Sequence, residues 1–175
     1  DREHMGRLLT RFAPLLFGIA AWFSCFTAVE ASVLVRIFGG AEFAAALIPV
    51  QIMALYPAHQ AYGQLASSVF HATGKTKTLR NLAFIEHFGG FLLVWLLVAP
   101  QDFLGMGLGA TGLALKTVTT QFIMVNLLFW MASRLIPLNF FRNLMLQGLI
   151  LGSLLGLAWV CKTATGIYFT DDAHQ

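Results

Sequence analysis

This 175-residue chain is too apolar to be a water-soluble domain, because 58% of its residues are apolar and 11% are charged, whereas soluble domains carry about 25% charged residues. Its mean hydropathy of +0.74 indicates the same. The net charge of +3 comes from short basic clusters between apolar runs, not from one basic stripe, which argues against a nucleic-acid partner.

Five runs of sequence are long and apolar enough to cross a bilayer. A spanning helix needs about 20 mostly apolar residues, because the hydrocarbon core is about 30 Å thick. The predicted helices cover about residues 12–37, 43–72, 82–98, 108–131 and 138–160. We therefore expect an all-α, polytopic membrane helix bundle that forms a single domain over residues 1–175. Residues 5–16 also have apolar side chains at helical spacing, which fits either a helix on the membrane surface or an extension of the first span.

Basic residues predict how these helices are oriented. They precede the first helix, lie between the second and third, and flank the join of the fourth and fifth. In that order they are Arg2, Arg7 and Arg11, then Lys75, Lys77 and Arg80, then Arg134 and Arg142. These segments share one side of the membrane if five helices alternate. The positive-inside rule then predicts a cytoplasmic N-terminus.

Polar residues recur along the second predicted helix at steps of three or four. They are Tyr56, Gln60, Gln64, Ser67 and His71, with Gly63 beside them. They form one face of a helix, and Pro57 predicts a kink in it. Within lipid such a face must meet protein or water. Two interpretations stay open, namely helix–helix packing through hydrogen bonds and the wall of an aqueous cavity.

Ionisable residues inside the spans need a partner, a hydrated cavity or a function. Glu30 and Lys116 are expected at matching depth, which suggests an ion pair or a shared cavity, although Lys116 can also snorkel to the interface. Glu86 is expected to reach back to Lys77 or Arg80. The neighbouring His87 is either structural or a group that couples transport to protons.

The sequence lacks the common motifs of catalytic and nucleotide-binding sites. It contains no Walker loop, no nucleophile elbow and no HExxH motif, and it shows no cluster of metal ligands near a membrane face. We therefore expect neither an enzyme nor a bound metal or cofactor.

Three segments resemble a known transporter family. They are residues 37–43 (Ile-Phe-Gly-Gly-Ala-Glu-Phe), residues 55–68, and residues 70–77 (Phe-His-Ala-Thr-Gly-Lys-Thr-Lys), and a further match is residues 108–115 (Leu-Gly-Ala-Thr-Gly-Leu-Ala-Leu). They resemble the bacterial polysaccharide flippases, which are the O-antigen and lipid-linked oligosaccharide exporters of the multidrug/oligosaccharidyl-lipid/polysaccharide (MOP) superfamily.

The resemblance implies that the chain is the C-terminal half of a two-lobed transporter. A sixth helix of that half is missing from the pattern, and position 1 is not Met, so we expect a fragment of a longer chain. Its partners would be the remaining transmembrane helices of the same transporter and membrane lipids. The expected location is the bacterial inner membrane.

The implied function is translocation of an undecaprenyl-diphosphate-linked oligosaccharide by alternating access, for polysaccharide or lipopolysaccharide biosynthesis. The expected lining of the substrate cavity is Gln60, Gln64, Ser67, Lys116 and Asn126. Glu30, Glu86 and His87 are the candidates for ion coupling. The alternatives are a multidrug or cation exporter of the same superfamily, a membrane-embedded enzyme of glycan assembly, and a non-transporting structural subunit.

Overall fold

The structure is a computed structural model that describes residues 2–165, and it contains only helices there. In chain order the elements are α1 (Arg2–Val29), α2 (Ala31–Gly39), the 3-10 helix η1 (Ala41–Ala46), α3 (Leu47–Met53), α4 (Tyr56–Ala72), α5 (Thr76–Val98), the 3-10 helix η2 (Gln101–Phe103), α6 (Gly109–Ala132) and α7 (Phe140–Thr165). Five stretches of this part of the chain are long and apolar enough to cross a membrane. The expected all-α bundle with five spans is therefore confirmed.

The first span begins earlier than predicted and is interrupted near its far end. α1 runs without a break from Arg2, so residues 5–16 extend the span and do not form a separate surface helix. Its buried positions recur every three or four residues, from Gly6 through Ala13 to Ala21, so one face packs inward along its length. The helix stops at Glu30, whose backbone (φ −96°, ψ 16°) leaves the helical region before α2 starts.

The second span is broken near its middle, as its proline predicts. α3 ends at Met53, and α4 begins at Tyr56 with Pro57 in its first turn. Proline has no N–H to donate to the carbonyl four residues earlier, and its ring crowds that carbonyl. The break divides the span into α3 and α4, and it lies next to the polar residues of α4.

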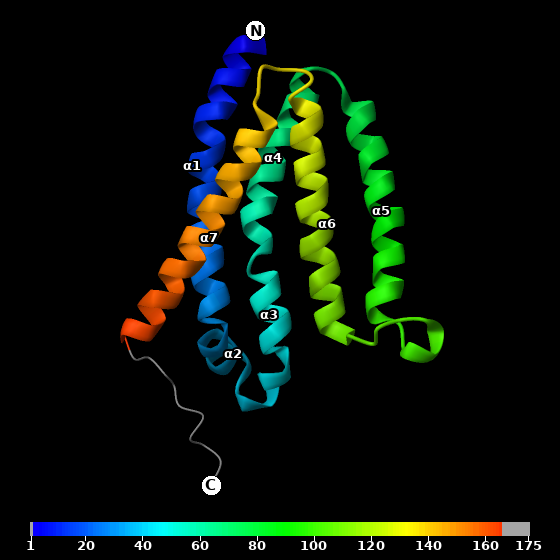
Figure 1. The fold of residues 1–175 in the computed structure, drawn as a ribbon. Coiled ribbons are helices and arrows are strands. Elements are labelled where there is room, and N and C mark those ends of the chain that lie inside the picture. The colour runs from blue at the N-terminus through cyan, green and yellow to red at the C-terminus, as the bar shows by residue number, and fades with distance from the viewer. Residues whose placement is uncertain (1, 166–175) are drawn as a thin grey trace.

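The helices run side by side, with α5 at one edge of the bundle and α7 near the other (Figure 1). α1 packs mainly on α7 and α4, α4 on α6, and α6 on α5 and α3. The N-terminus and the α4–α5 and α6–α7 connections lie at the same end of the bundle (Figure 1). The predicted basic segments therefore gather at one end, which we call the basic end.

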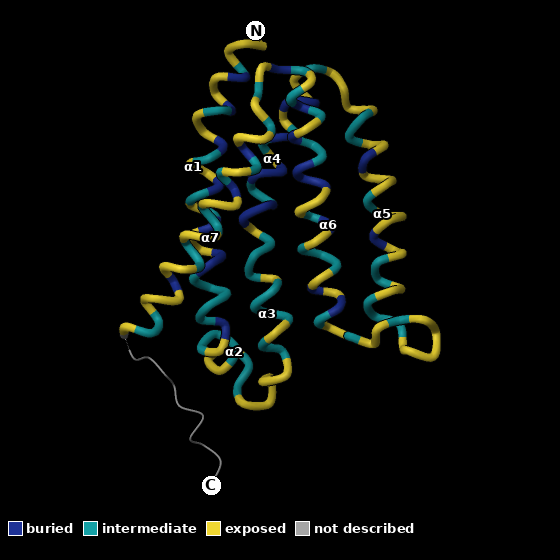
Figure 2. Tube along the Cα trace, in the orientation of Figure 1, coloured by how far each residue is buried: buried dark blue, intermediate teal, exposed yellow. Residues whose placement is uncertain are grey.

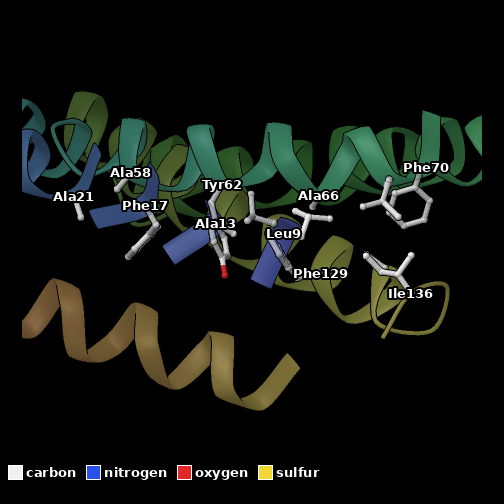
Figure 3. Close-up of a cluster of buried hydrophobic side chains, with 13 residues drawn as sticks. Leu9, Ala13, Phe17, Ala21, Ala58, Tyr62, Ala66, Phe70, Phe129 and Ile136 are labelled. Carbon is white, nitrogen blue, oxygen red and sulfur yellow. The ribbon is translucent and has the colours of Figure 1, made fainter. Parts of the chain in front are cut away.

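The core lies where α1, α4 and α6 meet (Figure 3). The Tyr62 ring stacks on that of Phe129, with 4.0 Å between centroids, and it meets Phe17 edge-on at 5.2 Å. Small residues on the facing helices let the backbones approach closely. They are Ala13 and Ala21 on α1, and Ala58 and Ala66 on α4.

The outer faces of α5 and α7 are apolar and exposed (Figure 2). On α5 only Leu82 and Gly90 are buried, while Phe88 is 73% exposed. A water-soluble protein rarely exposes contiguous apolar surface of this extent. These faces suit contact with lipid or with other membrane helices, so the chain is a multi-pass membrane protein.

Candidate functional site

Four side chains form a buried polar cluster where α4, α6 and α7 meet, and we define it as His59, Tyr62, Asn126 and Gln147. The amide of Gln147 donates from Nε2 to Oδ1 of Asn126 at 3.1 Å. Asn126 in turn donates from Nδ2 to the carbonyl of Phe122 at 2.9 Å. α6 and α7 otherwise touch little, so this amide pair is a main link between the two helices.

His59 lies at the aromatic side of this cluster. Its ring meets Phe17 edge-on at 5.6 Å and Phe122 at 5.0 Å. The Gln147 amide is the polar group beside both His59 and Tyr62, and the Tyr62 hydroxyl points toward α7 (Figure 3). His59 is 5% exposed although an imidazole is strongly polar. The fold therefore places a titratable ring inside an apolar bundle, two residues after Pro57.

Several polar atoms around this cluster have hydrogen-bonding capacity that the described residues do not use. Both ring nitrogens of His59, Oε1 of Gln147 and Oδ1 of the nearby buried Asn143 have no hydrogen-bond partner within residues 2–165. Buried polar atoms are usually paired, because leaving one unpaired costs about 1–3 kcal/mol. These atoms are suited to bind water or a polar group from outside this chain segment.

The predicted polar face of α4 is present, and it turns away from the core. Tyr56, Gln60 and Ser67 are half-buried, whereas Gln64 and His71 are exposed. The opposite face includes Ala58 and Val69, both fully buried. We call Gln60, Gln64 and Ser67 the polar stripe of α4.

Contacts within and beside the polar stripe are few. Gln60 accepts a hydrogen bond on Oε1 from Nε2 of Gln121 on α6 at 2.8 Å. The Ser67 hydroxyl donates to the Gln64 carbonyl at 3.0 Å. Gln64 keeps its side-chain amide exposed, so it is open to a neighbour outside the described residues.

The five predicted cavity residues do not form one cluster. Asn126 bonds to α7, while Gln60 bonds to Gln121. Lys116 is half-buried on α6 and lies over Gly90 of α5, where a Cβ added to the glycine would be 3.0 Å from the lysine Cε and 3.1 Å from its Nζ. Glycine at position 90 therefore makes room for this lysine. Gln60, Asn126 and Lys116 lie at three different interfaces, α4–α6, α6–α7 and α5–α6.

The predicted pairing of Glu30 with Lys116 is wrong. Glu30 pairs with Lys162 of α7, with Oε2 and Nζ 3.8 Å apart. Lys162 also donates from Nζ to the Val29 carbonyl at 2.8 Å. The rise per residue predicted matching depths for Glu30 and Lys116, but α1 packs on α7 whereas Lys116 faces α5.

The expected reach of Glu86 to Lys77 or Arg80 is also wrong, since no ion pair joins them in the described part of the chain. Residues six or nine apart lie on different sides of a helix, so these charges do not meet. The adjacent His87 is exposed, and its Nδ1 lies 2.6 Å from the Ala83 carbonyl. Glu86 is half-buried, and neither residue joins the buried polar cluster.

Sequence reasoning missed His59, Gln121, Asn143 and Gln147. Asn143 and Gln147 are four residues apart in the most apolar span, so helical spacing places both amides on one face. That signal was readable from the sequence. His59 does not belong to the polar pattern that includes Gln60, because adjacent residues point to different sides of a helix. The sequence therefore gave no sign that His59 is buried.

The buried polar cluster and the polar stripe are suited to bind polar groups through hydrogen bonds. Within residues 2–165 no three His, Cys, Asp or Glu side chains are grouped as metal ligands. The chain matches no protein-family model, no curated protein and no solved structure.

Proposed function

We propose that this chain is part of a transporter that moves an undecaprenyl-diphosphate-linked oligosaccharide across the bacterial inner membrane by alternating access. The observation that carries the proposal is the polar stripe of α4. Gln60, Gln64 and Ser67 lie on a membrane-spanning helix and face away from the apolar core. Gln60 bonds to Gln121 and Ser67 to its own helix, whereas lipid cannot satisfy the exposed amide of Gln64, so we infer that the stripe borders a hydrated cavity completed by further helices.

The polar groups beside this stripe suit a glycan. Gln60 and Gln121 offer paired amides between α4 and α6, and amides donate to and accept from sugar hydroxyls. The break before Pro57 adds backbone groups that a continuous helix would satisfy internally. Broken helices next to polar residues are typical of substrate sites in membrane transporters.

The position of Lys116 favours a substrate with an anionic headgroup. Its ammonium group is half-buried over Gly90, and no carboxylate pairs with it within residues 2–165. A diphosphate is costly to remove from water unless cations and hydrogen-bond donors replace its hydration. A cation exporter of the same superfamily fits less well, because the polar stripe contains no acidic residue.

Transport would be driven by an ion gradient, and Glu30, Glu86 and His87 remain the candidates for coupling. Glu30 would have to exchange its ion pair with Lys162 during the cycle. Glu86 is half-buried on α5 without an ion pair in the described part of the chain. Glu86→Gln should therefore abolish the dependence of export on the gradient if Glu86 is the coupling group.

Cysteine accessibility tests the hydrated cavity. In the intact protein with Cys25 and Cys161 replaced by alanine, Gln64→Cys should react with a water-soluble, membrane-impermeant thiol reagent. Leu92→Cys on the exposed apolar face of α5 is the matched control and should stay unlabelled. Equal labelling rates at positions 64 and 92 would contradict the proposal.

An export assay tests the cationic group. Lys116→Gln should reduce export of the lipid-linked glycan about ten-fold or more, because a charge-assisted contact contributes more than a neutral one. Thr117→Ala is the control on the same helix, since its hydroxyl donates to the Leu113 carbonyl of that helix. Unchanged export by Lys116→Gln would remove this lysine from the site.

A further inference from the structure

Two adjoining surface cavities lie at the basic end, between the start of α1 and the α6–α7 connection. The larger has a volume of about 650 Å³ and the smaller about 400 Å³. Both are lined by Thr10 of α1 and Pro137 of the connection, so they share part of their walls. We call the two cavities together the basic groove, and it shares no residue with the polar stripe or the buried polar cluster.

The groove is strongly positive. Arg7 and Arg11 line its smaller part, and Arg134 and Arg142 line its larger part. Glu3 is the one acidic residue in the lining, and it pairs with Arg7 at 3.7 Å. Within residues 2–165 no carboxylate pairs with the other three arginines. Three guanidinium groups with unneutralised charge therefore border one groove.

The groove is a built part of the fold. Gly6 of α1 lies so close to the α6–α7 connection that a Cβ there would be 2.9 Å from the Pro137 carbonyl oxygen. The Arg134 guanidinium lies 5.1 Å from the centre of the Trp130 ring, a cation–π arrangement that orients it. Asn139 accepts a hydrogen bond on Oδ1 from the Arg142 amide at 3.0 Å and so fixes the first turn of α7.

An apolar track leads away from the groove along α7. Phe141 lines the larger cavity, and Met145 and Leu149 follow at steps of four residues on the same face. Their exposures are 73%, 71% and 68%. The track starts at the basic end and follows a helix that is long and apolar enough to cross a membrane, so in a bilayer it would lead from the headgroup level toward the acyl chains. A charged pocket above an exposed apolar track matches a phospholipid better than a free anion.

We propose that the basic groove binds the phosphate group of an anionic phospholipid from the leaflet at the basic end, with an acyl chain along the α7 track. Arginine binds phosphate oxygens through two parallel hydrogen bonds, which lysine cannot reproduce. Basic pockets between membrane helices recognise lipid headgroups in this way. The proposal does not depend on the transported substrate.

Native mass spectrometry of the intact protein tests this binding. The protein is reconstituted with phosphatidylglycerol and phosphatidylcholine in equal amounts, and the lipids retained after detergent exchange are counted. Wild-type protein should retain phosphatidylglycerol preferentially. The double variant Arg134→Gln with Arg142→Gln should retain about ten-fold less phosphatidylglycerol than wild-type protein. Its helix content, measured by circular dichroism, should be unchanged.

The control removes equal charge at the same end of the bundle outside the groove. Lys75→Gln with Lys77→Gln should retain phosphatidylglycerol like wild-type protein, because both lysines lie in exposed positions beside the α4–α5 connection. An equal loss in this control would show unspecific surface attraction and overturn the proposal. Equal retention of the two lipids by wild-type protein would overturn it as well.

A second arm separates a lipid from a free anion. Met145→Asn changes the exposed apolar track without touching an arginine, and it should weaken phosphatidylglycerol retention several-fold. Inorganic phosphate at millimolar concentration should not displace the lipid. Displacement by phosphate together with no effect of Met145→Asn would indicate an anion site instead and would refute the lipid assignment.

Discussion

The close contact of α4 with α6 depends on the missing side chain of Gly63. A Cβ at this position would lie 2.8 Å from Cγ2 of Val125, well inside ordinary van der Waals contact, which starts at 3.4 Å. Val125 is 2% exposed, and its branched side chain has one strongly preferred rotamer in a helix. Gly63→Ala must therefore move a packed side chain or separate the helices.

The magnitude follows from two opposing terms. Adding a methyl group to a packed interface costs about 1–3 kcal/mol. Alanine is favoured over glycine in a helix by about 0.5–1 kcal/mol. We expect Gly63→Ala to lower the free energy of unfolding by about 1–2 kcal/mol, because the first term is larger at this contact.

Reversible unfolding in mixed micelles, followed by circular dichroism, measures this difference. Gly152→Ala on α7 is the matched control, because nothing lies within 4 Å of a Cβ at that position. The control should leave stability unchanged or raise it. The double variant Gly63→Ala with Val125→Ala should be more stable than the sum of the single changes predicts, by about 0.5 kcal/mol or more, because the smaller side chain restores the space.

Two results would refute this reasoning. If Gly63→Ala is as stable as Gly152→Ala, the helices are not in contact at position 63. If the two changes at positions 63 and 125 are strictly additive, the cost arises elsewhere than at this pair.

Three further predictions concern single contacts. Gln147→Leu should destabilise the fold by about 1 kcal/mol in the same unfolding assay, because Asn126 loses its donor and hydrogen bonds between membrane helices contribute about 0.6 kcal/mol on average. Lys162→Met should cost about 1 kcal/mol or less, since its pair with Glu30 is partly exposed, and the loss should shrink as salt is raised. Pro57→Ala should straighten the second span and lengthen the distance between spin labels placed at either end of it, measured by pulsed electron resonance.

Each of these has its own control. Ser153→Ala removes a hydroxyl that donates to the Ile150 carbonyl of its own helix, so it should not reproduce the effect of Gln147→Leu. Glu30→Gln should weaken the fold no further once Lys162→Met is present. An unchanged label distance in Pro57→Ala would show that packing of α3 on α6, and not proline, holds the break.

Much of the fold was readable from the sequence for a simple reason. A backbone in lipid must satisfy its hydrogen bonds internally, so each crossing is an apolar helix of at least the bilayer's thickness. Helical periodicity then placed Gln60, Gln64 and Ser67 on one face of the second span, as the structure has them. Pro57 likewise marked the break, because its effect on the backbone is local.

Only the tertiary structure decided which residues meet across helices. The rise per residue lets the depths of Glu30 and Lys116 be predicted from their positions within their helices. Their partners, however, depend on which helices adjoin and on how each helix is rotated about its axis. α1 lies against α7, so Glu30 meets Lys162, and α6 turns Lys116 toward α5. The bond between Asn126 and Gln147 and the burial of His59 arise in the same way, from lateral packing that a one-dimensional pattern does not contain.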